Sequence, residues 1–156
     1  MNILIRLADL SDYKSINMML CELHNYHVEN KPDIYKEVNC FFSESEYECM
    51  LKENQHSFIL SVVDDKISGF VWYRINTKGD KLENYRKQLW IEGVYVKHIY
   101  RGLGIAEKMI LEVINIAEQM KVDSVETMVW AFNDVSFNLF KKKFSVRAYI
   151  LTHDIK

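Results

Sequence analysis

Residues 94–121, VYVKHIYRGLGIAEKMILEVINIAEQMK, join an apolar, strand-like run to a helix-like run through two closely spaced glycines. In the second part, apolar residues recur at i, i+3 and i+4 from Ile105 to Met120, which predicts one long amphipathic helix. Such a helix must lie back over the sheet that its strand belongs to, because its apolar face has to be buried. The segment therefore predicts a layered domain of helices and strands.

Apolar periodicity and capping residues predict the elements on either side. The predicted strands are 2–7, 57–63, 67–75, 89–96, 124–131 and a final strand in SVRAYILTHDI, residues 145–155. Four helices are predicted. The first begins at Ser11 or Asp12 and runs to about His27, and the second begins at a capping box of Ser43 and Glu46. The third follows the two glycines, and the fourth is capped by Asn133 and runs to Lys142. This order indicates an α+β fold whose mixed sheet has two neighbouring strands connected by the long helix. With no repeat and no linker, residues 1–156 are expected to form a single domain.

Charge and composition argue against several classes of partner. The net charge is −2 and the isoelectric point about 6.2, so no nucleic-acid or membrane partner is expected. Cys21, Cys40 and Cys49 show no CxxC or Cys/His spacing of a zinc site, and each is expected to be a buried or half-buried thiol. No metal is predicted. The N-terminus lacks the apolar segment of a signal peptide, and the protein is expected to be cytoplasmic.

The loop Arg101-Gly102-Leu103-Gly104 has two interpretations. It is either a tight turn or a cradle for phosphate, since a helix N-terminus offers unpaired N–H groups and a partial positive charge. A P-loop is excluded because GxxxxGK[ST] is absent, and the GxGxxG of dinucleotide folds is incomplete because residue 107 is glutamate.

Three segments, in the right order, resemble the GCN5-related N-acetyltransferase (GNAT) family. VYVKHIYRGLGIAEKMI resembles its acetyl-CoA signature, with Arg101, Gly104 and Ala106 in the places of Arg/Gln-x-x-Gly-x-Gly/Ala. ILIRLADLSDY is similar to the family's opening strand and helix. NDVSFNLFKKKF resembles its downstream stretch, with Asn133 retained and Ser136 in an alanine position.

The resemblance implies a GNAT fold in which the fourth and fifth strands separate to hold acetyl-CoA, the expected cosubstrate. Backbone N–H groups would wrap its pyrophosphate, and the main chain of the fourth strand would pair with its pantetheine arm. Asn133 would reach that arm from the opposite side, with Phe140 packed near its end. The implied cofactor-binding residues are Val94, Tyr95, Val96, Arg101, Gly102, Leu103, Gly104, Ile105, Ala106, Glu107, Asn133 and Phe140.

Acyl transfer to an amine needs a base, because a free alkyl ammonium holds its proton up to a pH near 10. Glu92 is the predicted base: it lies in the apolar run LWIEGVYV, two residues before Val94 and so on the same face of a regular strand. Apolar surroundings would raise the pKa of such a carboxylate. The alternative is a structural or salt-bridged glutamate. The family resemblance assigns the oxyanion to a backbone N–H, here that of Val94.

Phe140 departs from the family pattern. It stands where the family has a tyrosine that protonates the leaving thiolate, and it has no hydroxyl. Water, unassisted departure of the thiolate, or another tyrosine such as Tyr95 or Tyr149 remain as alternatives. The sequence therefore predicts an N-acetyltransferase acting on a primary amine, with a non-catalytic acyl-CoA-binding or sensing domain as the alternative.

The acceptor is expected to be cationic, because acidic residues outnumber basic ones between residues 22 and 53. A polyamine, another small cationic amine, or a peptide or protein amine would fit. His24 and His27 are interpreted as surface or loop-packing residues rather than as part of the acceptor pocket, and Trp130 first as a core residue. Relatives often pair through their C-terminal strands, and the apolar segment AYILTHDI makes a homodimer the expected partner arrangement.

Overall fold

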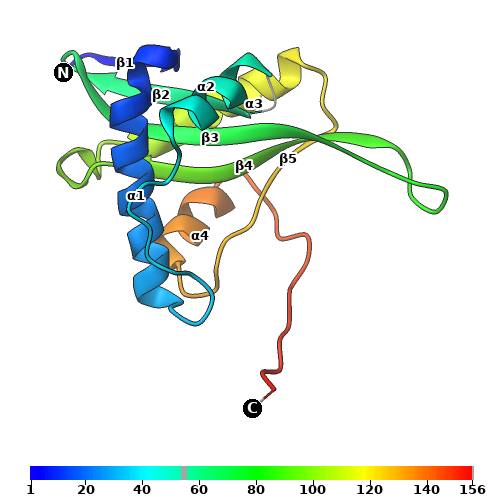
Figure 1. Ribbon diagram of the computed structural model, residues 1–156. Coiled ribbons are helices and arrows are strands. Elements are labelled where there is room, and N and C mark those ends of the chain that lie inside the picture. Colours follow the sequence, from blue (N-terminus) through cyan, green and yellow to red (C-terminus); the bar gives the residue numbers. More distant parts are fainter. Residues whose placement is uncertain (54–55, 156) are drawn as a thin grey trace.

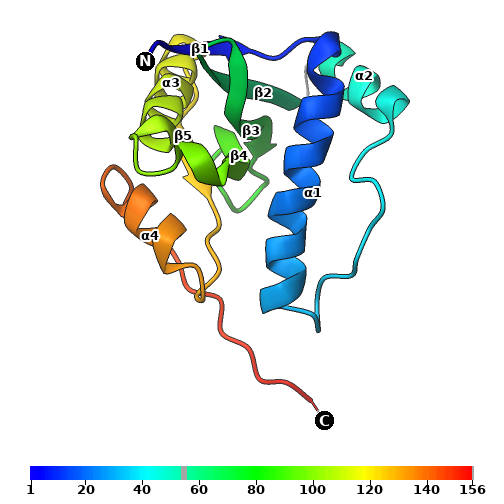
Figure 2. The ribbon, with the colours of Figure 1, turned by 90° about the vertical axis from the view of Figure 1, so that its left-hand side faces the viewer.

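The computed structural model of the protein describes residues 1–53 and 56–155, which form one twisted sheet covered by helices on both faces (Figures 1 and 2). The strands are β1 (Ile3–Leu7), β2 (His56–Val63), β3 (Lys66–Lys78), β4 (Arg86–Val96) and β5 (Ser124–Thr127). The helices are α1 (Tyr13–Asn30), α2 (Glu44–Lys52), α3 (Ile105–Gln119) and α4 (Asp134–Lys141), and single 3-10 turns span Leu10–Asp12 and His98–Tyr100.

The sheet order β1-β2-β3-β4-β5 confirms the predicted mixed α+β architecture. Each of the first three neighbouring pairs is antiparallel, whereas β4 and β5 are parallel. Parallel neighbours need a crossover connection, and α3 supplies it as the sequence predicts. The crossover places the glycine loop at the end of β4, beside the strand that follows α3.

A separate hydrophobic core fills each face of the sheet. On one face, α3 buries Met109 and Val113 against strand residues such as Val71, and Phe140 of α4 joins the same cluster. On the other face, α1 buries Met19 and Leu20 together with aromatic residues of α2 and the strands. In Figure 2, α1 and α2 lie on one side of the strands and α3 and α4 on the other. A ligand bound between two separated strands would therefore be able to contact helices on both faces of the sheet.

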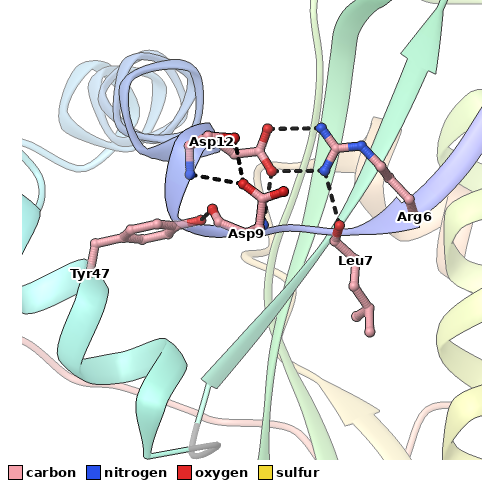
Figure 3. A network of polar contacts seen from close by, with 6 residues as sticks. Arg6, Leu7, Asp9, Asp12 and Tyr47 are labelled. Carbon is pink, nitrogen blue, oxygen red and sulfur yellow. Dashed lines mark hydrogen bonds and ion pairs between the residues drawn. The ribbon is translucent and has the colours of Figure 1, made fainter.

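An ion pair fixes the entry to α1 (Figure 3). Arg6 donates to both carboxylate oxygens of Asp12 at 2.8 Å, and the Asp12 side chain is only 5% exposed. The backbone N–H of Asp9 donates to the same carboxylate, and the Tyr47 hydroxyl donates to the Asp9 carbonyl at 2.8 Å. The hydrogen bond from Arg6 is the main reason that the pKa of Asp12 lies below its usual value. This cluster holds β1, α1 and α2 together.

Asp12→Asn is expected to lower the free energy of unfolding by about 2 kcal/mol at neutral pH, because bonds to a buried carboxylate lose their charge. The melting temperature should then fall by roughly 4–8 °C. Asp65→Asn is the matched control, since Asp65 is exposed in the β2–β3 turn at a positive φ that asparagine tolerates. An equal loss in both variants would show that the Arg6 pair is not responsible.

The pH dependence has a defined sign. Folding lowers the pKa of Asp12, so the contribution of its carboxylate to the free energy of unfolding is fully present above the unfolded aspartate pKa of about 3.9. This contribution disappears as the pH falls through the lower pKa of the folded state. Thermal melts between neutral pH and acid should therefore show a smaller decline for Asp12→Asn than for the natural protein.

The C-terminal prediction was wrong. Residues 145–155, all within the described part of the chain, form neither strand nor helix and extend away from the body as an exposed tail (Figure 1). The fifth strand is also shorter than predicted, ending at Thr127 rather than at residue 131. Cys40 and Cys49 are exposed, contrary to the expectation of buried or half-buried thiols, whereas Cys21 is half-buried as expected. Within residues 1–53 and 56–155, no helix is long and apolar enough to cross a membrane.

Candidate active site

The central strand β4 carries a bulge at Glu92. Gly93 lies opposite Trp72 and Ile91 lies opposite Tyr73, so β4 has one more residue than β3 at this point. A bulge leaves its extra residue outside the regular pairing and redirects the side chains around it. The simple alternation assumed between Glu92 and Val94 therefore does not hold, yet both residues line the same pocket.

That pocket forms where β4 and β5 separate. The two strands pair only between Gln88–Ile91 and Ser124–Thr127, and the Thr127 hydroxyl donates to the Ile91 carbonyl at 3.1 Å at the end of the pairing. Beyond this point Gly93 and Val94 face Met128, Val129 and Trp130 across the opening. The separation of strands four and five that the family resemblance implies is present.

Glu92 does not lie in the apolar surroundings that were predicted. Its carboxylate accepts a hydrogen bond from Arg74 Nε on β3, and its side chain is 23% exposed. Arg74 also donates to the Asn76 side chain at 2.9 Å, which holds the guanidinium in place. The Glu92 carboxylate thus has a fixed cationic partner in Arg74, and the same residue lines the pocket.

The glycine loop has the backbone that an anion cradle requires. Gly102 has a φ of +79° and Gly104 a φ of +73°, a region that side chains with a Cβ rarely adopt. No atom lies within 4 Å of the position that a Cβ would take at either glycine, so the space in front of the loop is open. Gly104 is the N-cap of α3, and Leu103 beside it is exposed. Ile105, in contrast, is buried in the core and anchors the loop.

Arg101 points back toward β4. Its Nε donates to the Val96 carbonyl at 2.9 Å, and its guanidinium lies 5.7 Å from the centroid of the Tyr95 ring. The Val96 carbonyl is therefore already engaged, whereas the resemblance implied a free one. The Tyr95 hydroxyl donates to Glu22 of α1, and burial, followed by this carboxylate, raises the pKa of Tyr95 to about 12.

Two basic residues directly after α4 lie near the cradle. Lys142 Nζ contacts the Glu107 carboxylate at 2.8 Å, and this hydrogen bond lowers the pKa of Glu107. Lys143 adds to the lowering through its charge. The pair neutralises a carboxylate in the first turn of α3, where a negative charge would otherwise repel a phosphate. Ala106, between the glycines and Glu107, is half-buried.

Helix α4 supplies the opposite wall of the pocket. Asn133 is its N-cap, and its side-chain oxygen accepts the backbone N–H of Ser136 at 3.0 Å. Asn133, Ser136 and Phe140 all line the pocket, and Phe140 is 5% exposed. Four of the residues singled out in the sequence therefore line one pocket, namely Glu92, Val94, Asn133 and Phe140, whereas Tyr95, Val96 and residues 101–107 do not line it.

An aromatic wall closes the pocket on the side of α1, and the sequence did not predict it. The wall consists of His27 and Trp130, which line the pocket, and of Tyr35 and Phe132, which pack against these two rings. The Trp130 indole donates to the Tyr35 hydroxyl at 2.9 Å, and the His27 ring lies 5.4 Å from Tyr35 and 6.5 Å from Phe132 between centroids. His24 packs outside it, with Nε2 bonded to the Lys36 carbonyl at 2.8 Å. In the sequence, the only indication is that aromatic residues are frequent in both of the distant segments that form the wall.

The comparisons with known proteins agree with this geometry. A model described as the acetyltransferase (GNAT) family matches residues 19–145. None of the curated protein sequences matches the chain. Among the described residues there is no group of three or more His, Cys, Asp or Glu side chains that could hold a metal ion.

Solved structures share the fold at low sequence identity. A mutant of the BH1408 protein from Bacillus halodurans has 21% identity and a TM-score of 0.88, with 98% of each chain covered. AAC(6')-Iy, solved in complex with the bisubstrate analogue CoA-S-monomethyl-acetylneamine, has 13% identity and a TM-score of 0.77 over 100% of this chain and 99% of that one. Glucosamine-6-phosphate N-acetyltransferase from Arabidopsis thaliana has 17% identity and a TM-score of 0.68 over 100% of both chains.

Separated β4 and β5, a glycine cradle at the start of α3 and a family match over residues 19–145 all lead to the same conclusion. This chain belongs to the GNAT acetyltransferase family.

Proposed function

We propose that the protein transfers the acetyl group of acetyl-CoA to a primary amine by direct attack through a tetrahedral intermediate. The observation that carries the proposal is the pocket between β4 and β5, which brings Glu92 and Val94 opposite Asn133 and Phe140. His27 and Trp130 of the aromatic wall line the same pocket.

The cofactor would lie along the end of β4. Its pyrophosphate would meet the backbone N–H groups of Gly102, Leu103, Gly104, Ile105, Ala106 and Glu107 at the positive end of α3. Its pantetheine arm would follow Val94, Tyr95 and Val96, with Asn133 on the far side. Arg101 would leave the Val96 carbonyl to meet a phosphate, and Lys142 and Lys143 would lie beside the 3′-phosphate. The open space in front of the glycines supports this placement.

In the proposed reaction, the amine nitrogen attacks the thioester carbonyl carbon, whose oxygen takes the negative charge. The Val94 N–H would donate to that oxygen, and the Glu92 carboxylate would attract the ammonium group and take its first proton. The bond between Glu92 and Arg74 supports a charged carboxylate that is held in one orientation.

The acceptor is proposed to be a small cationic amine or a peptide amine that enters along the aromatic wall. A cation within about 6 Å of a ring face is stabilised by the ring, and Trp130 already lies 5.8 Å from Lys31 Nζ. Glu29 and Glu37, which line a second hollow next to the end of α1, add negative charge on this side. The neighbour AAC(6')-Iy, whose bisubstrate analogue contains an acetylated neamine, supports an aminoglycoside-like member of the test panel.

Glu92→Gln is expected to lower kcat about a hundredfold, because the amide cannot accept the proton. Thiol release from acetyl-CoA would be followed with polyamines, aminoglycosides, amino acids and short peptides, and blanks without acetyl-CoA would correct for the protein's own cysteines. Glu118→Gln, at an exposed position of α3, is the control and should keep the natural rate. Unchanged release in Glu92→Gln would remove Glu92 from the mechanism.

A second candidate function is acyl-CoA binding without turnover, favoured by the missing hydroxyl at Phe140. It predicts that coenzyme A binds to the protein while no amine of the panel releases thiol. Acceptor-dependent release would exclude it.

We also propose a cytoplasmic homodimer. Val146, Tyr149, Ile150, Leu151 and Ile155 of the tail are 51–91% exposed, and β5 has no neighbour on its outer edge among the described strands. Exposed apolar runs of this kind mark interaction surfaces. The occupant proposed for the edge of β5 is the tail of a second copy.

A further inference from the structure

His27 lines the candidate pocket from the side of α1. It belongs to the last turns of α1, is half-buried, and lines the pocket together with Glu92, Val94 and Phe140. Its ring packs against Tyr35 and Phe132, which restricts its orientation. A titratable ring held by aromatic neighbours in this pocket can take part in proton transfer, beyond the packing role predicted for it.

The hydrogen bonds of His27 fix which ring nitrogen carries the proton. Nδ1 lies 2.9 Å from the carbonyl oxygen of Leu23, one turn earlier in α1. A carbonyl only accepts, so Nδ1 must be the donor, and the neutral ring then has its lone pair on Nε2. No group of the described residues bonds to Nε2. The ring therefore has one free basic nitrogen.

The surroundings keep this ring neutral. Burial lowers the pKa of His27, and the nearby charge of His24 on the same helix lowers it further, against an opposing effect of the Leu23 bond. The other titratable or charged groups around it are Tyr26 on α1, Tyr35 and Lys31 on the segment after α1, and Glu92 on β4, whose carboxylate is paired with Arg74. A neutral imidazole can accept a proton at physiological pH.

We propose that His27 Nε2 carries a proton from the attacking nitrogen to the leaving thiolate. The inference rests on the proposed acetyltransferase function and deepens it. When the N–C bond forms, the nitrogen still holds one proton too many, and Nε2 takes it. When the C–S bond breaks, its electron pair goes to sulfur, and the imidazolium returns the proton there. The products are the amide and coenzyme A as a thiol, and His27 ends neutral.

In this role His27 supplies the proton for the leaving thiolate, which Phe140 cannot donate because it has no hydroxyl. The nitrogen and the sulfur are bonded to the same carbon in the tetrahedral intermediate, so one ring nitrogen can serve both in turn. An imidazolium is a stronger acid than a thiol, whose pKa is about 8.5, so the second transfer runs downhill. Glu92 takes the first ammonium proton and His27 the second, which gives each side chain a separate step.

The test is His27→Asn. Asn30, one turn later in α1, donates its side-chain amide to the Tyr26 carbonyl at 2.7 Å, so an asparagine at position 27 can keep the same i to i−4 bond while Nε2 is lost. With acetyl-CoA and the amine of the panel that releases thiol fastest, kcat is expected to fall about a hundredfold. The affinity for coenzyme A and the melting temperature should stay unchanged.

The pH profile separates a proton carrier from a structural residue. In the natural protein kcat/KM should decline below the ordinary histidine value of about 6.5, because the protonated ring cannot accept a proton. His27→Asn should lose this decline, whereas the control His24→Gln should retain the rate above it and keep the decline, moved to slightly higher pH because the charge of His24 no longer lowers the pKa of His27. An unchanged rate or profile in His27→Asn would overturn the proposal while the proposed function stands. Absence of amine-dependent release in the natural protein would overturn both.

Discussion

Gly104→Val is expected to weaken coenzyme A binding roughly a thousandfold. The valine Cβ would occupy the open space in front of the loop, at a φ of +73° that a β-branched residue strongly disfavours. Two or more backbone N–H bonds to the pyrophosphate would be lost, each worth about 1.5–3 kcal/mol when one partner is charged. Their sum of about 4 kcal/mol corresponds to that factor.

Titration calorimetry with coenzyme A measures the effect, and Gly79→Val supplies the matched control. Gly79 lies in the β3–β4 hairpin loop at a φ of +135°, where an added Cβ would come 2.6 Å from the Tyr85 backbone. That variant should lose stability but keep its cofactor affinity, because its strain is remote from the cradle. Gly104→Val with natural affinity and an intact fold would place the pyrophosphate elsewhere.

Local signals accounted for most of the fold. The capping box of Ser43 and Glu46, the N-cap Asn133 and the apolar stripe of α3 are each formed by residues close in sequence, and the structure confirms all three. The final strand failed for the opposite reason. The alternation in SVRAYILTHDI is typical of a strand, but a strand exists only with a partner, and residues 145–155 find none among the described residues.

The candidate site shows the same division. The glycine loop is one continuous segment, so its positive φ angles follow from the sequence alone. The bulge at Glu92 depends on the register of β3 against β4, and the bond to Arg74 joins residues on separate strands. His27 meets Phe132 across more than a hundred residues, and no periodicity in α1 reports that contact.

The tail of residues 145–155 carries the other large expected effect. Tyr149 and Leu151 would lie on one face of an extended strand and Val146 and Ile150 on the other, so both faces are apolar, as in a strand that is buried on both sides. Arg147 pairs with Glu126 of β5, which directs the start of the tail past the open edge of the sheet. A second copy's tail can extend that edge by backbone pairing.

The double variant Ile150→Lys, Leu151→Asp is therefore expected to convert a dimer into a monomer of 18.6 kDa by light scattering. Burying one charge on each face costs several kcal/mol, which should weaken the dimer roughly a thousandfold. Leu82→Lys with Tyr85→Asp is the control, because these residues of the β3–β4 hairpin loop are 85% and 80% exposed and the net charge changes equally. Natural protein that remains monomeric at its highest soluble concentration would contradict the dimer, and would leave the apolar tail as a surface for a different partner.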